Sequence, residues 1–275
     1  MTATPLVRTA PTGTTGIRVT QARVIHSEWI KFRSVRSSLW TLAAGVVLLV
    51  GLSALIGSVT MSQWDSLDEA TRASLDPVAL ATSGSTFAQL ATGVLAVLMI
   101  TGEYTTGMIR ASLTVVPRRL PVLWAKLAVF SAVTFVVTLI SSFAAFFVSQ
   151  AVVSGHGLSV PITDGDALRA VFGLAFYLTV AGIVAMALGA LLRTTAAGIS
   201  TLVAVFLVIP PLVSLLPASV SGDLVKYLPS SAGQAMFGTG GGDGSLSPGT
   251  GALVFCAYAV VLVAVAAWRL RRTDV

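Results

Sequence analysis

Charged residues and cysteine are scarce in this chain. Only 10% of its 275 residues are Asp, Glu, Lys or Arg, and 55% are hydrophobic, whereas soluble domains average about 25% charged. This composition excludes an ordinary water-soluble globule and predicts an all-α protein whose surface mostly faces lipid. The single cysteine, Cys256, rules out a disulfide within the chain. Because Cys256 lies in an apolar run, we expect it to be a packing residue rather than a reactive thiolate.

Catalytic and metal-binding parts are equally few. The two histidines, His26 and His156, provide little from which to build a His-based metal site or a Ser-His dyad. Asp164-Gly165-Asp166 lacks the further oxygen ligands of a calcium loop and favours a turn between two spans. No glycine-rich loop ends in Gly-Lys-Ser or Gly-Lys-Thr, so the chain has no P-loop of its own. No metal site is predicted, and any energy source must lie in another chain.

Six long uncharged runs of about 19 to 27 residues interrupt the chain. At about 1.5 Å per helical residue each run can cross a hydrocarbon core of about 30 Å. The runs predict six transmembrane helices at about residues 38–60, 79–102, 123–153, 169–192, 195–216 and 250–268. No acidic or basic residue lies in the middle of any run, which argues against ion-coupled transport.

The charges sort by side of the membrane once these six spans are assumed. One side receives 14 of the 17 Lys and Arg residues and a net charge of +11, and the other side has a net charge of −5. The positive-inside rule then predicts a multi-pass protein of the cell membrane with both termini in the cytoplasm. Because the basic residues flank spans and have no soluble domain around them, we expect contacts with anionic lipid and no nucleic-acid partner.

The segment before the first span has its own pattern. Residues 1–19 are expected to be a disordered cytoplasmic leader, and residues 20–275 the six-span domain. Within residues 20–36, Ile25, Trp29 and Phe32 recur at helical spacing, while Lys31 and its polar neighbours face elsewhere. This predicts an amphipathic helix in the plane of the membrane interface, with a simple basic flank of the first span as the alternative.

Two further segments interrupt the spans. The stretch from Thr105 to Pro117 is too apolar for a solvated linker, so a short cytoplasmic helix that binds a protein partner is expected. Glu103 precedes it and is expected either to pair with Arg110 or Lys126 or to fix the turn into this segment. Pro210-Pro211 requires the fifth span to kink or stop. Residues 217–249 then predict short helices that dip into the outer interface.

A small-residue face in the fourth span, Ala181, Ala185 and Gly189, would let helix backbones approach closely, within the chain or across a dimer.

Three motifs stand at the ends of the predicted spans. The first is Ser27-Glu28-Trp29-Ile30-Lys31-Phe32-Arg33-Ser34-Val35-Arg36-Ser37. The second is Gly102-Glu103-Tyr104-Thr105-Thr106-Gly107-Met108-Ile109-Arg110, followed by Pro117-Arg118-Arg119 and Lys126. The third is Tyr227-Leu228-Pro229 with Gly233. Together these motifs resemble those of the membrane subunits of ATP-binding-cassette exporters of the type-two, drug- and polysaccharide-exporter class. One departure is Thr105, where relatives often carry a basic residue.

The resemblance implies a role for each segment. Residues 20–36, with Glu28, Trp29, Lys31, Phe32, Arg33 and Arg36, would form the elbow helix. Residues from Glu103 to Arg110 with Pro117 and Arg118 would couple the chain to a separate ATPase subunit, which would bind ATP and magnesium. Pro217, Tyr227, Leu228, Pro229 and Gly233 would belong to outer re-entrant helices.

As a whole, the resemblance implies a permease that pairs with a second permease subunit, identical or different, and exports a hydrophobic or amphipathic substrate. It implies no catalytic residue and no cofactor in this chain. Two alternatives stay open: a membrane scaffold or immunity protein, and a membrane enzyme acting on lipid.

Overall fold

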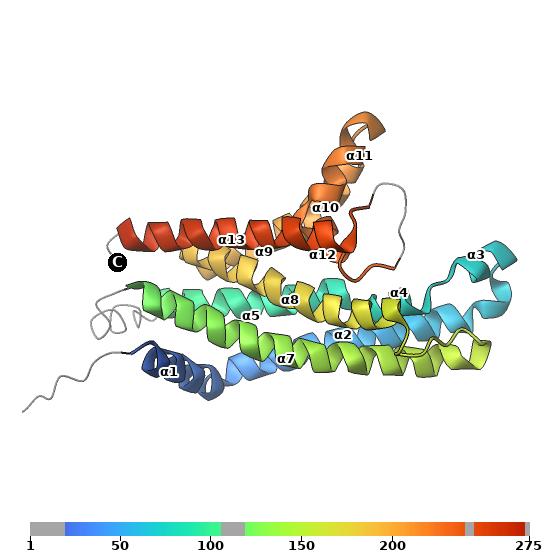
Figure 1. Cartoon of the computed structure of the whole chain (residues 1–275), viewed down its shortest axis with the longest axis horizontal. Helices are drawn as coiled ribbons and strands as arrows, with labels where there is room; N and C mark the ends of the chain where they lie inside the picture. The colour runs from blue at the N-terminus through green and yellow to red at the C-terminus, as the bar shows by residue number, and fades with distance from the viewer. Residues whose placement is uncertain (1–19, 106–118, 240–244, 273–275) are drawn as a thin grey trace, which may run out of the picture.

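The fold is a bundle of long helices. The computed structural model describes residues 20–105, 119–239 and 245–272, and every regular element within these ranges is helical (Figure 1). Six segments are long and apolar enough to cross a membrane, which confirms the prediction of an all-α, six-span chain. These segments are Arg36–Ser62, Pro77–Thr105, Leu120–His156, Gly165–Leu192, Thr195–Ser214 and Pro248–Arg272.

Short helices accompany the long ones. The first half of the chain forms α1 (Gln21–Ser34), α2 (Arg36–Ser62), η1 (Trp64–Ser66), α3 (Glu69–Ser74), α4 (Pro77–Thr82) and α5 (Ser85–Thr105). The second half forms α7 (Arg119–Val153), η2 (Ser154–His156), α8 (Gly165–Leu192), α9 (Thr195–Val203), η3 (Ala204–Val208), α10 (Ile209–Ser214), α11 (Ala218–Tyr227), α12 (Pro229–Gln234) and α13 (Pro248–Arg272).

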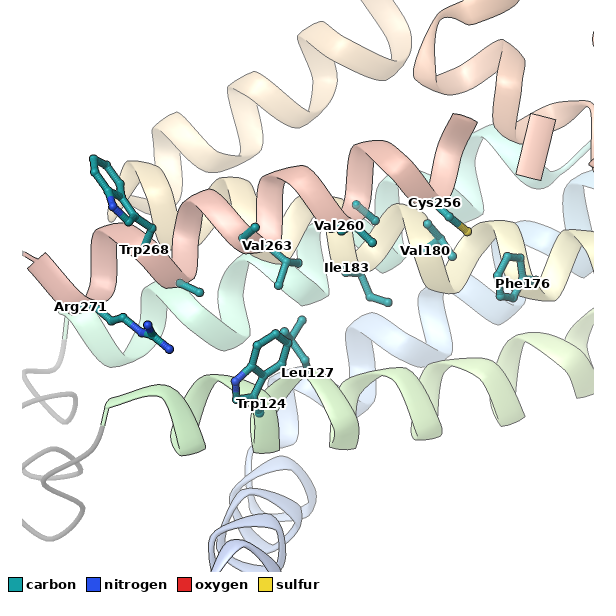
Figure 2. Close-up of a pocket in the computed structure, with 13 residues that line it drawn as sticks. Trp124, Leu127, Phe176, Val180, Ile183, Cys256, Val260, Val263, Trp268 and Arg271 are labelled. Atoms are coloured by element: carbon teal, nitrogen blue, oxygen red, sulfur yellow. The ribbon is translucent and has the colours of Figure 1, made fainter. Parts of the chain in front are cut away.

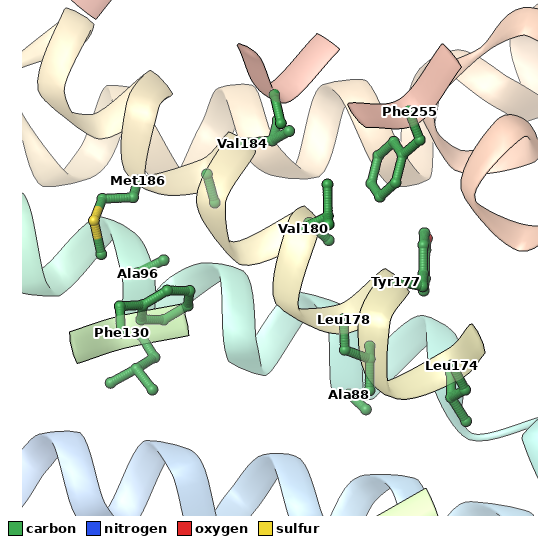
Figure 3. Packing of buried hydrophobic residues seen from close by; sticks show 14 of the residues in the cluster. Ala88, Ala96, Phe130, Leu174, Tyr177, Leu178, Val180, Val184, Met186 and Phe255 are labelled. Atoms are coloured by element: carbon green, nitrogen blue, oxygen red, sulfur yellow. The ribbon is translucent and has the colours of Figure 1, made fainter. Parts of the chain in front are cut away.

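Helix α8 is the centre of the bundle. Its span is 72% buried, whereas the span made of α9, η3 and α10 is only 17% buried. Helix α8 packs against α5, α7, α9 and α13. Figure 3 shows Leu178 of α8 beside Ala88 of α5, and Tyr177 of α8 close to Phe255 of α13. The Tyr177 hydroxyl donates a hydrogen bond to the side-chain oxygen of Gln89 on α5, which satisfies both groups in the bundle interior.

Small residues set the distance between α8 and α5. A Cβ added at Gly189 would lie 2.7 Å from Cγ2 of Ile100, so no larger residue fits there without displacing α5. Ala181 and Ala185, on the same face, are fully buried. The small-residue face predicted from the sequence therefore packs within the chain, between α8 and its neighbours.

The two ends of the bundle differ in charge. One end, called the basic end below, gathers α1, the start of α7 and the last turns of α5, α8 and α13 (Figure 1). It carries Lys31, Arg33, Arg36, Lys126, Arg193, Arg269, Arg271 and Arg272. The opposite end contains η1, α3 and the start of α8, with Asp65, Asp68, Glu69, Asp76, Asp164 and Asp166. The charge sorting inferred from the sequence is thus a spatial property of the fold.

Asp164 has the local role that the sequence suggested. Its Oδ1 atom accepts hydrogen bonds from the backbone N–H groups of Asp166 at 2.9 Å and Ala167 at 3.4 Å. It therefore caps the N-terminus of α8 in the turn between two spans.

The fifth span changes its winding where its prolines begin. The five residues of η3, Ala204–Val208, form a π-helical turn directly before Pro210 and Pro211. Since proline lacks an N–H, the preceding turn loses hydrogen-bond donors, and wider turns are a usual way to absorb that loss. The helix continues as α10 rather than stopping, and α10 and α11 lead away from the bundle (Figure 1). The placement of α11 and α12 in the outer membrane interface stays a prediction.

Helix α12 is held in place by a contact that only glycine permits. A Cβ at Gly233 would overlap the ring of Tyr177, which is fully buried on α8. We predict that Gly233→Ala lowers the free energy of unfolding by about 1 to 3 kcal/mol, the usual cost of an overfilled core. The measurement is the unfolding midpoint of the purified protein in detergent.

The matched control is Gly51→Ala. Gly51 is also helical, in α2, but has no neighbouring atom within 4 Å of an added Cβ. Alanine there should be neutral or slightly stabilising because it favours helix more than glycine does. Equal effects of the two substitutions would contradict the assigned contact.

Candidate functional site: a buried ionic cluster

Four charged side chains from three helices meet at the basic end. They are Glu28 and Lys31 of α1, Glu103 of α5 and Lys126 of α7, and they are called the ionic cluster below. The Nζ atom of Lys126 lies 2.7 Å from Oε2 of Glu28 and 3.1 Å from Oε1 of Glu103. The Nζ atom of Lys31 lies 2.7 Å from Oε1 of Glu28 and 3.0 Å from Oε1 of Glu103. Carboxylates and ammonium groups therefore alternate around a ring with no net charge.

Most of the ionic cluster is removed from solvent. Glu28 is 2% exposed, Lys126 is 3% exposed and Glu103 is 7% exposed, whereas the Lys31 side chain reaches the surface. Burying an ion costs several kcal/mol, and only close pairing with good hydrogen bonds offsets that cost. Each carboxylate has two ammonium partners, and each ammonium group has two carboxylate partners. Removal of any one residue therefore leaves two of the others with an incomplete set of ion pairs.

Helix α1 brings Glu28 into the cluster because of its helical phase. Val24, Glu28 and Phe32 recur four residues apart and form the buried face of α1. Val24 packs in a small cluster with Val122 and Ala125 of α7. The apolar residues on either side of Glu28 thus fix α1 against the bundle and direct the carboxylate inward.

A second face of α1 remains exposed. Ile25 is 36% exposed and Trp29 is 44% exposed, although both belong to the stripe that the sequence analysis joined to Phe32. The prediction of an amphipathic helix is therefore right in kind, but its apolar residues divide between the protein and the surroundings. The position of α1 in the plane of the membrane interface stays a prediction.

Electrostatic interactions within the ionic cluster keep Glu28 and Lys31 of α1 charged. Burial alone would raise the pKa of Glu28, but the Lys126 and Lys31 ammonium groups outweigh burial and hold this pKa below its ordinary range. Burial alone would lower the pKa of Lys31, but Glu28 and Glu103 raise it above the ordinary range. The stabilisation from Glu28 is thus lost as the pH falls through its depressed pKa, and that from Lys31 as the pH rises through its raised pKa. Between these limits both side chains are ionised.

The cluster tests the sequence interpretation of Glu103. Its predicted pairing with Lys126 is present, while the alternative partner, Arg110, lies outside the described residues. Lys31 lies off the stripe of Ile25 and Trp29, as expected, and on its own side of α1 it binds both carboxylates. Glu28 was singled out only through the family resemblance. A carboxylate between Val24 and Phe32 on one helical face was the signal that could have identified it from sequence.

Of the other residues expected to couple the chain to a partner, the structure describes Tyr104 and Thr105. Tyr104 has the guanidinium of Arg193 5.8 Å from its ring centre. The hydroxyl of Thr105 donates to the carbonyl oxygen of Thr101 at 2.8 Å, within the last turn of α5. The remaining residues of this set lie outside the described residues: Thr106, Gly107, Met108, Ile109, Arg110, Pro117 and Arg118.

The remaining predicted residues lie away from the cluster. Arg33 and Arg36 are exposed near the junction of α1 and α2. In the outer set, Pro217 precedes α11, Tyr227 ends it, Leu228 precedes α12, Pro229 begins it and Gly233 packs on Tyr177. The structure does not bring this set together with the ionic cluster.

The geometry of the cluster suits mechanical linkage better than chemistry. All four members are committed to one another, and the ring ties α1 and α7 to the end of α5. No group of three or more His, Cys, Asp or Glu side chains within residues 20–105, 119–239 and 245–272 is placed to hold a metal ion. Helix α5 ends at Thr105 and α7 begins at Arg119, so the cluster lies at the base of segment 106–118.

Comparison with known proteins identifies one family. The model of the family described as ABC-2 family transporter protein matches residues 24–211. The matched region runs from α1 to α10 and includes all four members of the ionic cluster. No curated protein matches the chain.

The buried cations of the cluster should be costly to remove singly. We predict that Lys126→Met lowers the free energy of unfolding by about 3 to 5 kcal/mol, because it leaves two buried carboxylates with Lys31 as their shared partner. Adding Glu103→Gln to Lys126→Met should recover part of that loss. The measurement is a double-mutant cycle on the purified protein in mixed detergent micelles.

The control is Asp166→Asn, which breaks an exposed pair in which Arg169 Nη2 lies 3.0 Å from Asp166 Oδ1. Exposed pairs contribute about 0 to 1 kcal/mol. If Lys126→Met cost no more than this control, the cluster would not be a buried, interdependent unit.

Proposed function

Because this chain belongs to the ABC-2 family of transporter proteins and is a permease subunit, we propose that it exports a hydrophobic or amphipathic substrate with energy from a separate ATPase subunit. The family is that of ABC transporters, whose membrane components act with an ATP-binding subunit. The absence of a P-loop from the sequence supports a division of labour between two chains. ATP and magnesium would bind to the partner subunit.

The ionic cluster is the observation that carries this proposal. Segment 106–118 connects α5 to α7, and the cluster joins the two helices where that segment leaves them. A partner that moves the segment would therefore move the ends of α5 and α7 together, and α1 with them through Glu28 and Lys31. Such a rigid unit can convert nucleotide-driven closure of the ATPases into a shift between conformations of the bundle.

The orientation of the chain follows from its charge. The basic end would lie in the cytoplasm, with both termini, because Lys and Arg residues accumulate on that side of membranes. Exposed Ile25 and Trp29 of α1 would then contact lipid at the cytoplasmic surface. Helices α11 and α12 would lie at the outer surface and close the pathway there.

The span of α9, η3 and α10 is the proposed place for a second permease subunit or the pathway between the two. Its low burial within this chain leaves large apolar side chains uncovered, among them Leu207, Val208 and Leu212. The second subunit would be a copy of this chain or a related one. A membrane scaffold or immunity protein would have no need of a segment that responds to nucleotide.

The decisive experiment measures coupling. We predict that Gly107→Pro combined with Arg110→Glu abolishes substrate-stimulated ATP hydrolysis when the permease and its ATPase subunit are reconstituted in vesicles. The control is Glu69→Lys on α3, an exposed charge reversal at the opposite end of the bundle, which should leave hydrolysis unchanged. Unaltered ATPase binding and export in the double variant would reject segment 106–118 as the coupling element. If no hydrophobic substrate stimulated ATP hydrolysis by the wild-type complex, the result would favour a membrane scaffold.

The threading of the chain can be tested separately. With Cys256 replaced by alanine, a cysteine at position 118 should resist a membrane-impermeant thiol reagent in intact cells and react after permeabilisation. A cysteine at Ala73, exposed on α3 at the opposite end, should react in both conditions. Labelling of position 118 from outside would reverse the assigned orientation.

A further inference from the structure

An apolar groove runs along the outside of the bundle at the basic end. It has a volume of about 690 Å³ and lies between α7 and α13, with α8 as its floor (Figure 2). The floor is buried at Val180 of α8, whereas the rims are exposed at Trp124 of α7 and Val260 of α13. The groove is therefore open to whatever surrounds the bundle.

The length and direction of the groove suit a lipid chain. Helix α13 contributes one continuous face from Cys256 to Arg271, with lining residues three or four positions apart. These 15 residue steps correspond to about 22 Å along the helix, more than the roughly 15 Å of one leaflet of the hydrocarbon core. A groove parallel to a membrane-spanning helix is also parallel to acyl chains.

Charge is confined to one end of the groove. Arg271 is the single charged residue among those that line it, and it lies in the last turn of α13. In Figure 2 its guanidinium extends from α13 across the groove toward Trp124 of α7. An indole beside a cation is the arrangement that proteins favour where the hydrocarbon region meets the lipid headgroups.

Arg271 differs from its two neighbours of the same turn. Arg269 donates a hydrogen bond to the carbonyl oxygen of Leu191 at the end of α8. The guanidinium of Arg272 lies 4.7 Å over the ring of Trp268. Within the part of the chain that the structure describes, Arg271 has no ion pair or hydrogen bond that would occupy it. Its charge is therefore available to a ligand in the groove.

We propose that this groove binds an anionic glycerophospholipid of the leaflet at the basic end. One acyl chain lies along α13 and α8, and the phosphate accepts hydrogen bonds from the guanidinium of Arg271. The volume of about 690 Å³ lies within the range of about 300 to 1,000 Å³ that is usual for small-molecule sites. An apolar groove with one cation at its end matches the chemistry of this ligand from chain to headgroup.

A second copy of the chain is a poorer occupant. Two copies that paired groove to groove would bring their basic ends together, with Arg271 and its neighbours of one copy near those of the other. Like charges at close range oppose such a contact. An anionic headgroup at the same place neutralises the arginines instead. The proposal concerns a bound lipid and does not depend on which substrate the permease exports.

The test compares lipid binding by matched arginine variants. Purified full-length protein in detergent is titrated with phosphatidylglycerol or phosphatidylcholine, and bound lipid is counted by native mass spectrometry. The wild type should retain phosphatidylglycerol in preference to phosphatidylcholine. Arg271→Gln should raise the Kd for phosphatidylglycerol about tenfold, the effect of losing a charge-assisted hydrogen bond, and raise the Kd for phosphatidylcholine less, because the choline cation repels the guanidinium and weakens its contact with the phosphate.

Arg272→Gln is the matched control, since it removes the same charge from the same turn but not from the groove. It should leave the Kd within about twofold of wild type. Ala264→Phe adds bulk at an exposed position that lines the groove, and should weaken binding of both lipids without altering charge. Equal losses in Arg271→Gln and Arg272→Gln, or no preference for the anionic lipid, would overturn the proposal.

A cross-linking measurement decides between lipid and a second copy. In a Cys256→Ala background, Val260→Cys on the rim should form no disulfide between copies in vesicles that contain phosphatidylglycerol. Efficient cross-linking there would assign the groove to a permease interface and overturn the proposal. Lipid binding is measured without the ATPase subunit, so its failure and a failure of coupled export are separate results.

Discussion

The absence of water from a membrane interior is the constraint on which this structure depends. A charged group in or near the hydrocarbon must find its counter-charge within the protein, because no solvent is there to screen it. Glu28 and Glu103 satisfy this requirement through Lys31 and Lys126, and in doing so they connect three helices that are distant in sequence. The same constraint keeps other charges at the ends of the bundle and makes Tyr177 and Gln89 meet inside it.

The first turns of α7 contact α1, the ionic cluster and the apolar groove. Val122 and Ala125 pack against α1, Lys126 completes the ionic cluster, and Trp124 and Leu127 line the groove. This division is possible because successive residues of a helix point in directions about 100° apart. The start of α7 is therefore the place where α1, the end of α5 and the apolar groove contact one another, immediately after segment 106–118.

The sequence predicted those features that depend on composition and on charge near span ends. The six spans, their basic and acidic ends and the Glu103–Lys126 pair could be inferred because hydrocarbon imposes them on any chain. The inward direction of Lys31 could not be inferred, because the apolar stripe of Ile25, Trp29 and Phe32 suggested that a different side of α1 faces the bundle. The contact of Gly233 with Tyr177 and the groove between α7 and α13 each depend on segments that are distant in sequence. Local sequence patterns do not predict how such segments pack.

The π-helical turn of the fifth span has a consequence for every residue after it. A π turn accommodates about one residue more than an α turn, so the side chains of α10 are rotated by about 100° relative to an uninterrupted helix. Ile209 and Leu212, exposed residues of α10, therefore point to the side that this one extra residue sets. Deletion of one residue within Ala204–Val208 would restore regular winding and turn this apolar surface to a different side, while the span stays apolar.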